Sequence, residues 1–169
     1  PDLVHDNHQV EPPRTPEQGY HFSEDMIDHS ISFLKDLRAT YERKPFLLYV
    51  APGACHAPHQ APASFIEPYR GRFDAGWDRW REQVFARQIS SGLLPKGTEL
   101  SERPSWVPSW ESLSSDERRL FARMMEVYAG FLEHTDHHVG RLIDAIEDLG
   151  VLDNTIVYYI LGDNGASAE

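Results

Sequence analysis

Two oxygen-bearing side chains stand next to each other near the C-terminal end of the sequence, at Asp163 and Asn164. A carboxylate and an amide carbonyl are hard oxygen donors, the ligand type that Ca²⁺ and Mg²⁺ prefer. Gly162 and Gly165 flank the pair, and glycine lets the backbone turn tightly around them. The same residues also suit an Asx-type turn after a strand. The pair is therefore either part of a cation site or a plain turn.

A second group with chemical potential lies in residues 51–62, which include Cys55, His56 and His59. Two neutral imidazoles could bind a metal, but their i, i+3 spacing in a loop rich in proline is weak evidence for a metal pair. Each histidine could simply be a solvated loop residue. Cys55 could act as a nucleophile, but neighbours in sequence seldom face each other productively, and a buried, inert thiol is the simpler interpretation.

The elements that must position these residues can be read from apolar spacing. Ile27, Ile31, Leu34 and Leu37 recur at helical intervals after Ser23, which favours an amphipathic helix over 24–40 with Ser23 as its N-cap. The continuously apolar run 46–50 then predicts a strand buried on both faces.

The longest predicted element covers residues 115–149. Ser114 and Glu117 fit a capping box, a long apolar stripe follows, and Gly150 suits the C-terminal cap. Only one of the adjacent His137 and His138 can face the core of such a helix. The apolar run 155–161 predicts a second buried strand.

Residues 63–113 are the least regular part of the sequence and predict an excursion over the surface that also lines a pocket. Within it, Trp77, Trp80 and Val84 have the spacing of a helix, which we place at about 75–90. The tryptophans are most simply packing residues, and an aromatic pocket wall is the alternative.

Alternation of helices and strands indicates an α/β fold with a mainly parallel sheet flanked by helices. In such sheets ligands bind outside the carboxyl ends of the strands. If strands 46–50 and 155–161 are near neighbours, the loop holding His56 and the pair Asp163–Asn164 converge on one rim.

The overall charge of the chain argues against two classes of binding partner. The chain has 16 Lys and Arg against 27 Asp and Glu, a formal charge of −11, which argues against nucleic acid and against an anionic membrane surface. No apolar run approaches the length of a membrane span. With one cysteine in the chain, no internal disulfide is possible. Localisation stays open between a bacterial cytoplasm and periplasm, and so does the oligomeric state.

Taken together and in order, three stretches resemble the sulfatase family, in particular bacterial arylsulfatases. They are "KPFLLYVAPGACHAPHQAP", "YRGRFDAGWDRWR" and "MMEVYAGFLEHTDHHVGRLIDAIEDLGVLDNTIVYYILGDNGA". The similarity runs from about Tyr20 to Ala166. The last stretch, a long helix followed by a turn, an apolar strand and Asp-Asn-Gly, is the most specific of the three.

The resemblance implies an alkaline-phosphatase-like α/β fold, incomplete in this chain, with residues 1–169 as the central part of a sulfatase catalytic domain. It implies hydrolysis of small-molecule sulfate esters by a formylglycine nucleophile and a divalent cation, Ca²⁺ rather than Mg²⁺. By position, Asp163 and Asn164 would be metal ligands. His56 would touch the sulfate and help to protonate the leaving oxygen.

Departures from the family pattern concern the nucleophile. Its precursor cysteine belongs to a Cys-x-Pro-x-Arg motif, whereas after Cys55 the proline falls one place late and the arginine is absent. The family's paired N-terminal acids and its downstream active-site lysine also have no match. We therefore expect the formylglycine to lie outside this chain, and the chain alone to be inactive. Two alternatives remain: a phosphate or phosphonate ester hydrolase of the same superfamily, and a non-catalytic binding module on this scaffold.

Overall fold

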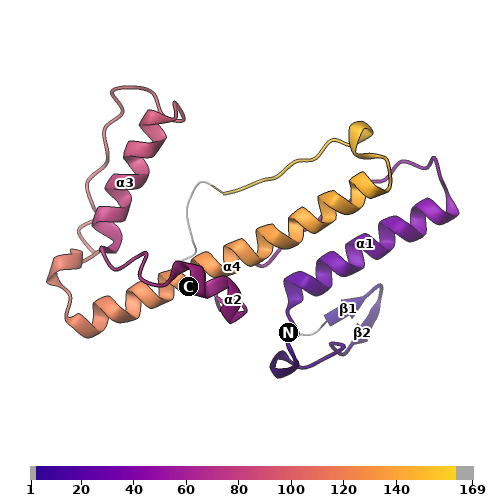
Figure 1. The fold of residues 1–169 in the computed structure, drawn as a ribbon, viewed down its shortest axis with the longest axis horizontal. Helices are drawn as coiled ribbons and strands as arrows, with labels where there is room; N and C mark the ends of the chain where they lie inside the picture. The colour runs from indigo at the N-terminus through magenta and orange to yellow at the C-terminus, as the bar shows by residue number, and fades with distance from the viewer. Residues whose placement is uncertain (1–2, 163–169) are drawn as a thin grey trace. The chain divides into compact units, whose positions relative to one another are not determined.

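The computed structural model of the chain describes residues 3–162 (Figure 1). The chain divides into two compact units. The first unit consists of Pro1–Pro62 with Phe131–Glu169, and the second unit consists of Ala63–Gly130. Within the described residues, no helix combines the length and the apolar character needed to cross a membrane.

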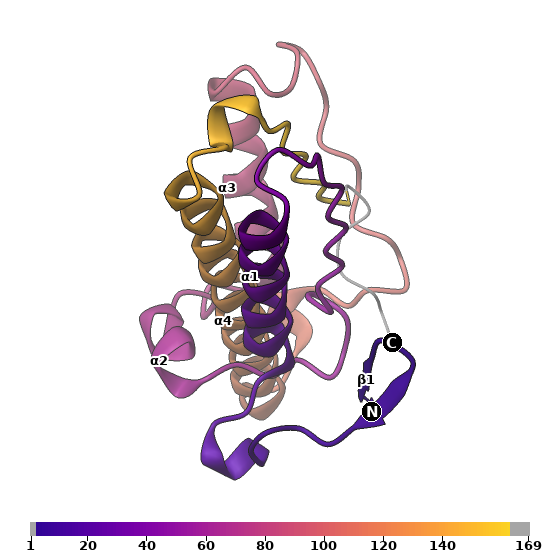
Figure 2. The ribbon, with the colours of Figure 1, turned by 90° about the vertical axis from the view of Figure 1, so that its right-hand side faces the viewer.

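The first unit is built on two helices, α1 (Phe22–Thr40) and the C-terminal half of α4 (Ser115–Asp148), which run side by side in both views (Figures 1 and 2). Their seam buries Ile27 and Leu34 of α1 against Leu142 and Ile146 of α4, each at most 7% exposed. Burial of each such side chain stabilises the fold by about 1.5–3 kcal/mol. The helical spacing of these residues in the sequence thus predicted the faces that meet.

The structure confirms the predicted helix at 115–149 to within one residue, as well as both of its predicted caps. At its start the Ser114 backbone N–H donates to Glu117 Oε2 (2.8 Å), and the Glu117 N–H donates to Ser114 Oγ (3.3 Å). These reciprocal bonds satisfy two donors that have no partner within the helix. At its end Gly150 adopts φ of 68°, the left-handed conformation that glycine tolerates without steric cost.

Helix α1 begins differently from the prediction. Its N-cap is His21, whose Nδ1 accepts a hydrogen bond from the Ser23 backbone N–H at 3.2 Å. Ser23 itself is 4% exposed inside the first turn, so its assignment as the N-cap is wrong. A ring nitrogen serves here as the acceptor that a hydroxyl or carboxylate usually supplies.

Before α1, the described chain begins with a small antiparallel hairpin of β1 (Leu3–His5) and β2 (His8–Val10). Asp6 in its turn has φ of 52°, a conformation that Asp adopts more readily than most residues. A 3-10 turn at Pro16–Gln18 follows.

Among residues 3–162, the two predicted strands are extended but pair with no other strand. The one sheet among residues 3–162 is the hairpin, so the prediction that 46–50 and 155–161 are strands buried on both faces is wrong for the described structure. In the first segment Phe46, Leu48 and Val50 pack on the helix seam, whereas Leu47 is 96% and Tyr49 is 88% exposed. A strand needs a neighbour for its backbone donors and acceptors, and local apolar composition cannot supply one.

In the second unit, α2 (Ala63–Ile66) and α3 (Gly76–Ser90) accompany the N-terminal part of α4. Short 3-10 turns lie at Glu67–Tyr69 and Trp110–Ser112 of this unit and at Leu152–Asn154 of the first. The bounds of α3 confirm the predicted helix at about 75–90. Phe73, Trp110 and Ala122 form the buried cluster of the second unit. The segment after α3 folds back so that Trp110 reaches this cluster.

Gly76, at the start of α3, leaves less room for a Cβ than any other glycine of the second unit. It has φ of 78°, and a Cβ at this position would lie 2.1 Å from ring atoms of Trp110. We expect Gly76→Ala to lower the free energy of unfolding by about 2–4 kcal/mol, because it adds overpacking to the cost of a left-handed alanine. Urea unfolding followed by circular dichroism measures this change.

Gly92→Ala is the matched control. Gly92 has φ of 77°, but a Cβ there meets nothing within 4 Å. This variant therefore carries only the backbone cost, about 1–2 kcal/mol. Equal destabilisation by the two substitutions would contradict the role assigned to the contact with Trp110.

Candidate functional site

His56, the predicted proton donor, lies exposed in the loop that follows the extended segment 46–50. Its backbone N–H donates to the Gly53 carbonyl (2.8 Å), which closes a tight turn. The Nδ1 of its ring lies 2.6 Å from the Ala57 carbonyl oxygen. Because a carbonyl can only accept, Nδ1 carries the proton, and Nε2 is the basic nitrogen of the neutral ring. This arrangement orients His56 and determines at which nitrogen it exchanges a proton.

Two histidines fix the conformation of the same loop through hydrogen bonds to its backbone carbonyls. His59 Nε2 donates to the Cys55 carbonyl at 3.2 Å, which braces the loop internally. His21 Nε2 donates to the Gln60 carbonyl at 3.0 Å. Since His21 Nδ1 already caps α1, one imidazole joins the start of that helix to the loop that carries His56.

Phe131 of α4 gives these histidines a common packing surface. Its ring centre lies 5.9 Å from that of His21 and 6.4 Å from that of His59. Aromatic rings at such distances add about 0.5–1.5 kcal/mol beyond their burial. The loop is therefore held by both helices of the first unit.

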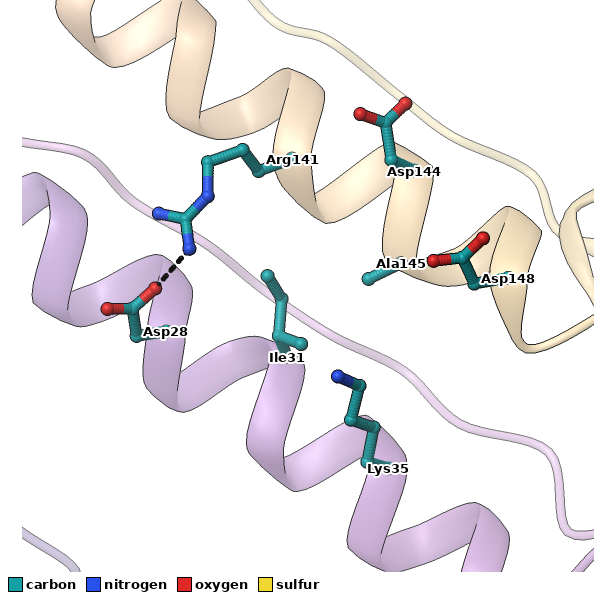
Figure 3. A pocket seen from close by; sticks show the side chains of 7 residues that line it. All are labelled: Asp28, Ile31, Lys35, Arg141, Asp144, Ala145 and Asp148. Atoms are coloured by element: carbon teal, nitrogen blue, oxygen red, sulfur yellow. Dashed lines mark hydrogen bonds and ion pairs between the residues drawn. The ribbon is translucent and has the colours of Figure 1, made fainter.

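Two buried histidines, His134 and His138, continue from His21 along α4, and we call these two residues the histidine line. The rings of His21 and His134 have centres 4.1 Å apart, and His134 Nε2 lies 3.0 Å from His138 Nε2. Arg141 donates from Nη1 to His138 Nδ1 (2.8 Å) and from Nη2 to Asp28 of α1 (2.6 Å). Figure 3 shows the Arg141–Asp28 bond across the two helices.

The hydrogen-bond directions in this line follow from the arginine. A guanidinium only donates, so Nδ1 of His138 accepts and Nε2 of the neutral ring carries its proton. That Nε2–H then donates to His134 Nε2. The chain of donors thus runs from Arg141 through His138 to His134, with both rings neutral.

Burial keeps these rings neutral at ordinary pH. His134 is 2% exposed, and burial lowers its pKa to about 4, with smaller contributions from His21, His138 and His137. Burial also lowers the pKa of His138, and Arg141 and His137 lower it further. The carboxylates of Glu24 and Asp28 oppose this decrease. The buried face carries His138, which confirms that only one residue of the pair 137–138 faces the core.

His134 is the residue that sequence analysis missed. It lies four positions before His138 and three after Phe131, so helical spacing alone would have placed it on the buried face. Its partner His21 lies far away in the sequence, and no local pattern indicates that contact.

The predicted metal ligands Asp163 and Asn164 lie outside the described residues. The segment that leads to them is described as far as Gly162 and lies along α4, where the Tyr159 hydroxyl donates to Asp136 Oδ1 at 3.2 Å. Burial raises the pKa of Tyr159, followed by the bond to Asp136 and a smaller electrostatic contribution from Cys55.

The described residues contain no group of three or more His, Cys, Asp or Glu side chains suited to hold a metal. The groove between α1 and α4, about 440 Å³, carries Asp144, Asp148 and Lys35 beside the Arg141–Asp28 pair (Figure 3). Charges of both signs line this groove, and the Arg141–Asp28 pair joins the two helices across it.

The histidine line makes stability depend on pH. The pKa of His134 in the folded state is lower than in the unfolded chain, so between about pH 4 and pH 6.5 the unfolded state binds the proton and the folded state does not. The contribution of neutral His134 to the free energy of unfolding is therefore fully present above about pH 6.5, and it is lost as the pH decreases toward about 4. We expect His134→Gln to reduce this pH-dependent loss by an amount on the order of 1–3 kcal/mol.

Urea unfolding at a series of pH values measures the effect. His8→Gln serves as the control, because His8 is exposed on the N-terminal hairpin and contributes to the pKa of neither His134 nor His138, so its substitution should leave the pH profile unchanged. If the His134→Gln and wild-type profiles are parallel between pH 4 and 7, the interpretation is wrong.

Known proteins resemble this chain over most of its length. The model of the family described as Sulfatase matches residues 2–169. An uncharacterised sulfatase of Schizosaccharomyces pombe is 34% identical over 150 residues, which cover 88% of this chain and 26% of that protein. An arylsulfatase of Klebsiella aerogenes is 29% identical over 131 residues, covering 78% of this chain and 28% of the relative. An arylsulfatase of Volvox carteri is 23% identical over 159 residues.

The chain thus spans about a quarter of the length of the curated relatives that it matches. The family match nevertheless extends over almost all of its residues and includes both the His56 loop and the long helix that anchors it. This chain belongs to the sulfatase family.

Proposed function

We propose that the protein of which this chain is a part hydrolyses sulfate esters of small molecules. The observation that carries the proposal is the family match over residues 2–169, together with an oriented, exposed histidine on an anchored loop. Two of the relatives that the chain resembles are arylsulfatases, which makes aryl sulfates the first substrates to test.

His56 is proposed as the residue that contacts the sulfate and protonates the leaving oxygen. An ester oxygen leaves readily only if a proton reaches it as the bond to sulfur breaks, and a histidine suits that transfer near neutral pH. The bond from Nδ1 to the Ala57 carbonyl leaves Nε2 as the position that gains and loses the proton. The exposure of His56 gives a substrate access to it.

Asp163 and Asn164 are proposed as ligands of a divalent cation, Ca²⁺ rather than Mg²⁺. Their carboxylate and amide oxygens are of the donor type that fits such an ion. A bound cation would stabilise negative charge on the sulfate oxygens. Two ligands fill only part of a shell of roughly six to eight oxygens, so the proposal requires further ligands from elsewhere in the protein.

The nucleophile is proposed to be a formylglycine in a part of the protein other than this chain. Cys55 lacks the Cys-x-Pro-x-Arg context of its precursor. In the structure its backbone carbonyl accepts a hydrogen bond from His59, and its side chain is half-buried.

In the full-length protein, we expect His56→Ala to lower kcat for phenyl sulfate by about 10²–10⁴-fold. The loss should be smaller for 4-nitrophenyl sulfate, because its leaving phenolate is stable without a proton. Steady-state assays of both esters measure the difference, with exposed His137→Gln as the control. An equal loss with the two esters would show that His56 does not protonate the leaving oxygen.

Phenyl phosphate belongs in the same assays. Turnover of the phosphate ester at a higher kcat/KM than the sulfate ester would replace the proposed reaction by phosphate ester hydrolysis.

The 169-residue chain alone is expected to show no multiple turnover of aryl sulfates, because the proposed nucleophile lies outside it. It should also bind Ca²⁺ only weakly. Calorimetry measures that affinity, with Asp163→Ala as the comparison. Micromolar Ca²⁺ binding that disappears in this variant would contradict the idea that most ligands come from elsewhere.

A further inference from the structure

The second unit contains an apolar groove on α3 that the proposed reaction does not use. Its volume is about 350 Å³, within the range of small-molecule sites. Most of its lining comes from one stripe of the helix and the rest from the segment that follows. The lining residues are Trp77, Trp80, Arg81, Val84, Phe85, Gln88 and Leu100.

The two indole rings in this groove are held by their surroundings. Trp77 meets Trp110 edge-on, with ring centres 4.9 Å apart, and its Nε1 donates to the Pro108 carbonyl at 3.2 Å. Trp80 meets Phe73 edge-on at 5.2 Å. Both indoles are half-buried, so each ring keeps accessible surface. Rings fixed in this way can bind a flat ligand without losing further conformational freedom.

Positive charge lies at the edge of this aromatic surface. Arg81 lines the groove, and its Nη2 bonds to the hydroxyl and carbonyl oxygens of Ser101. Within the described part of the chain no carboxylate lies within ion-pair distance of Arg81. The Arg87 guanidinium lies over the Trp80 ring, 5.2 Å from its centre. A guanidinium has five N–H donors, so Arg81 keeps donors that can bind an anion.

The acidic residues of α3 do not cancel this charge. Asp78 pairs with Arg103 at 3.0 Å, and Glu82 pairs with Arg79 at 3.4 Å. Residues 63–130 contain ten Lys and Arg and ten Asp and Glu, so the formal net charge of −11 belongs to the rest of the chain. An organic anion would meet less repulsion on the second unit than on the first.

We propose that this groove binds a planar aromatic ring that carries a negatively charged group. The ring lies against Trp77, Trp80 and Phe85, and the anionic group accepts hydrogen bonds from Arg81. An aryl sulfate has this chemistry, and the choice of sulfate as the anion rests on the proposed function. The aromatic ring and the negative charge follow from the groove itself.

Binding is tested by calorimetry on the 169-residue chain with 1-naphthalenesulfonate, which no sulfatase reaction can hydrolyse. We expect saturable binding that is at least tenfold tighter than that of uncharged 1-naphthol. Raising the salt concentration should weaken the binding of the sulfonate but not that of the naphthol. Equal affinities for the two compounds, or no saturable binding, would overturn the proposal.

Variants locate the site. Arg81→Gln should weaken sulfonate binding about tenfold, and Trp80→Ala should abolish it. Arg79→Gln removes an equal charge from an exposed side chain paired with Glu82 and should leave affinity unchanged. Ser101→Ala breaks the hydroxyl bond to Arg81 but keeps the charge, and should change affinity less than twofold.

If circular dichroism shows that Trp80→Ala does not fold, the sulfonate affinities of Arg81→Gln and Arg79→Gln test the position of the anionic group instead. Equal affinities of these two variants would place the anion elsewhere. Because the sulfonate assay needs no turnover, its failure leaves the proposed hydrolysis untouched, and absence of hydrolysis in the full-length protein leaves the groove untouched.

Discussion

The apolar seam between α1 and the C-terminal half of α4 is the interaction on which the first unit depends. Ile27 and Leu34 are buried against Leu142 and Ile146, and this pairing determines how the two helices lie. With the helices so placed, the start of α1 meets α4 near Phe131. His21 then bonds both to α1 and to the loop that carries His56, so the candidate proton donor is positioned by packing far from itself.

The polar groups near this seam are arranged so that none requires a buried charge without a partner. Arg141 is neutralised by Asp28 and donates to His138, and burial keeps the imidazoles of His138 and His134 neutral. A protonated imidazole in this line would face Arg141 and a second ring without solvent to stabilise it. The same burial that keeps these imidazoles neutral therefore makes the unit sensitive to acid.

Membership in the sulfatase family implies an alkaline-phosphatase-like α/β fold. The described residues contribute long helices and two extended segments to such a fold. The one sheet among these residues is the small β1–β2 hairpin. The apolar segments 46–50 and 155–161 keep large side chains exposed, including Leu47 at 96% and Ile160 at 85%. Alternate residues of 46–50 pack on the helices, which is the pattern of a strand in a layered sheet. The second unit differs in character, because its rings are packed around Trp110 and its arginines balance its acids.

What the sequence by itself determined was local. Spacing and capping residues predicted α3 and α4, including the bonds of Ser114 with Glu117 and the turn at Gly150, because these depend on residues within a few positions of one another. The His56 loop was recognisable from its residues, while the roles of His56, Asp163 and Asn164 remain predictions. Only the tertiary structure decided that His21 caps α1, that His134 and His138 form a buried line, and that the two apolar runs do not pair. The physical reason is that each of these depends on a partner distant in sequence, and a pattern within one segment carries no information about which partner it will meet.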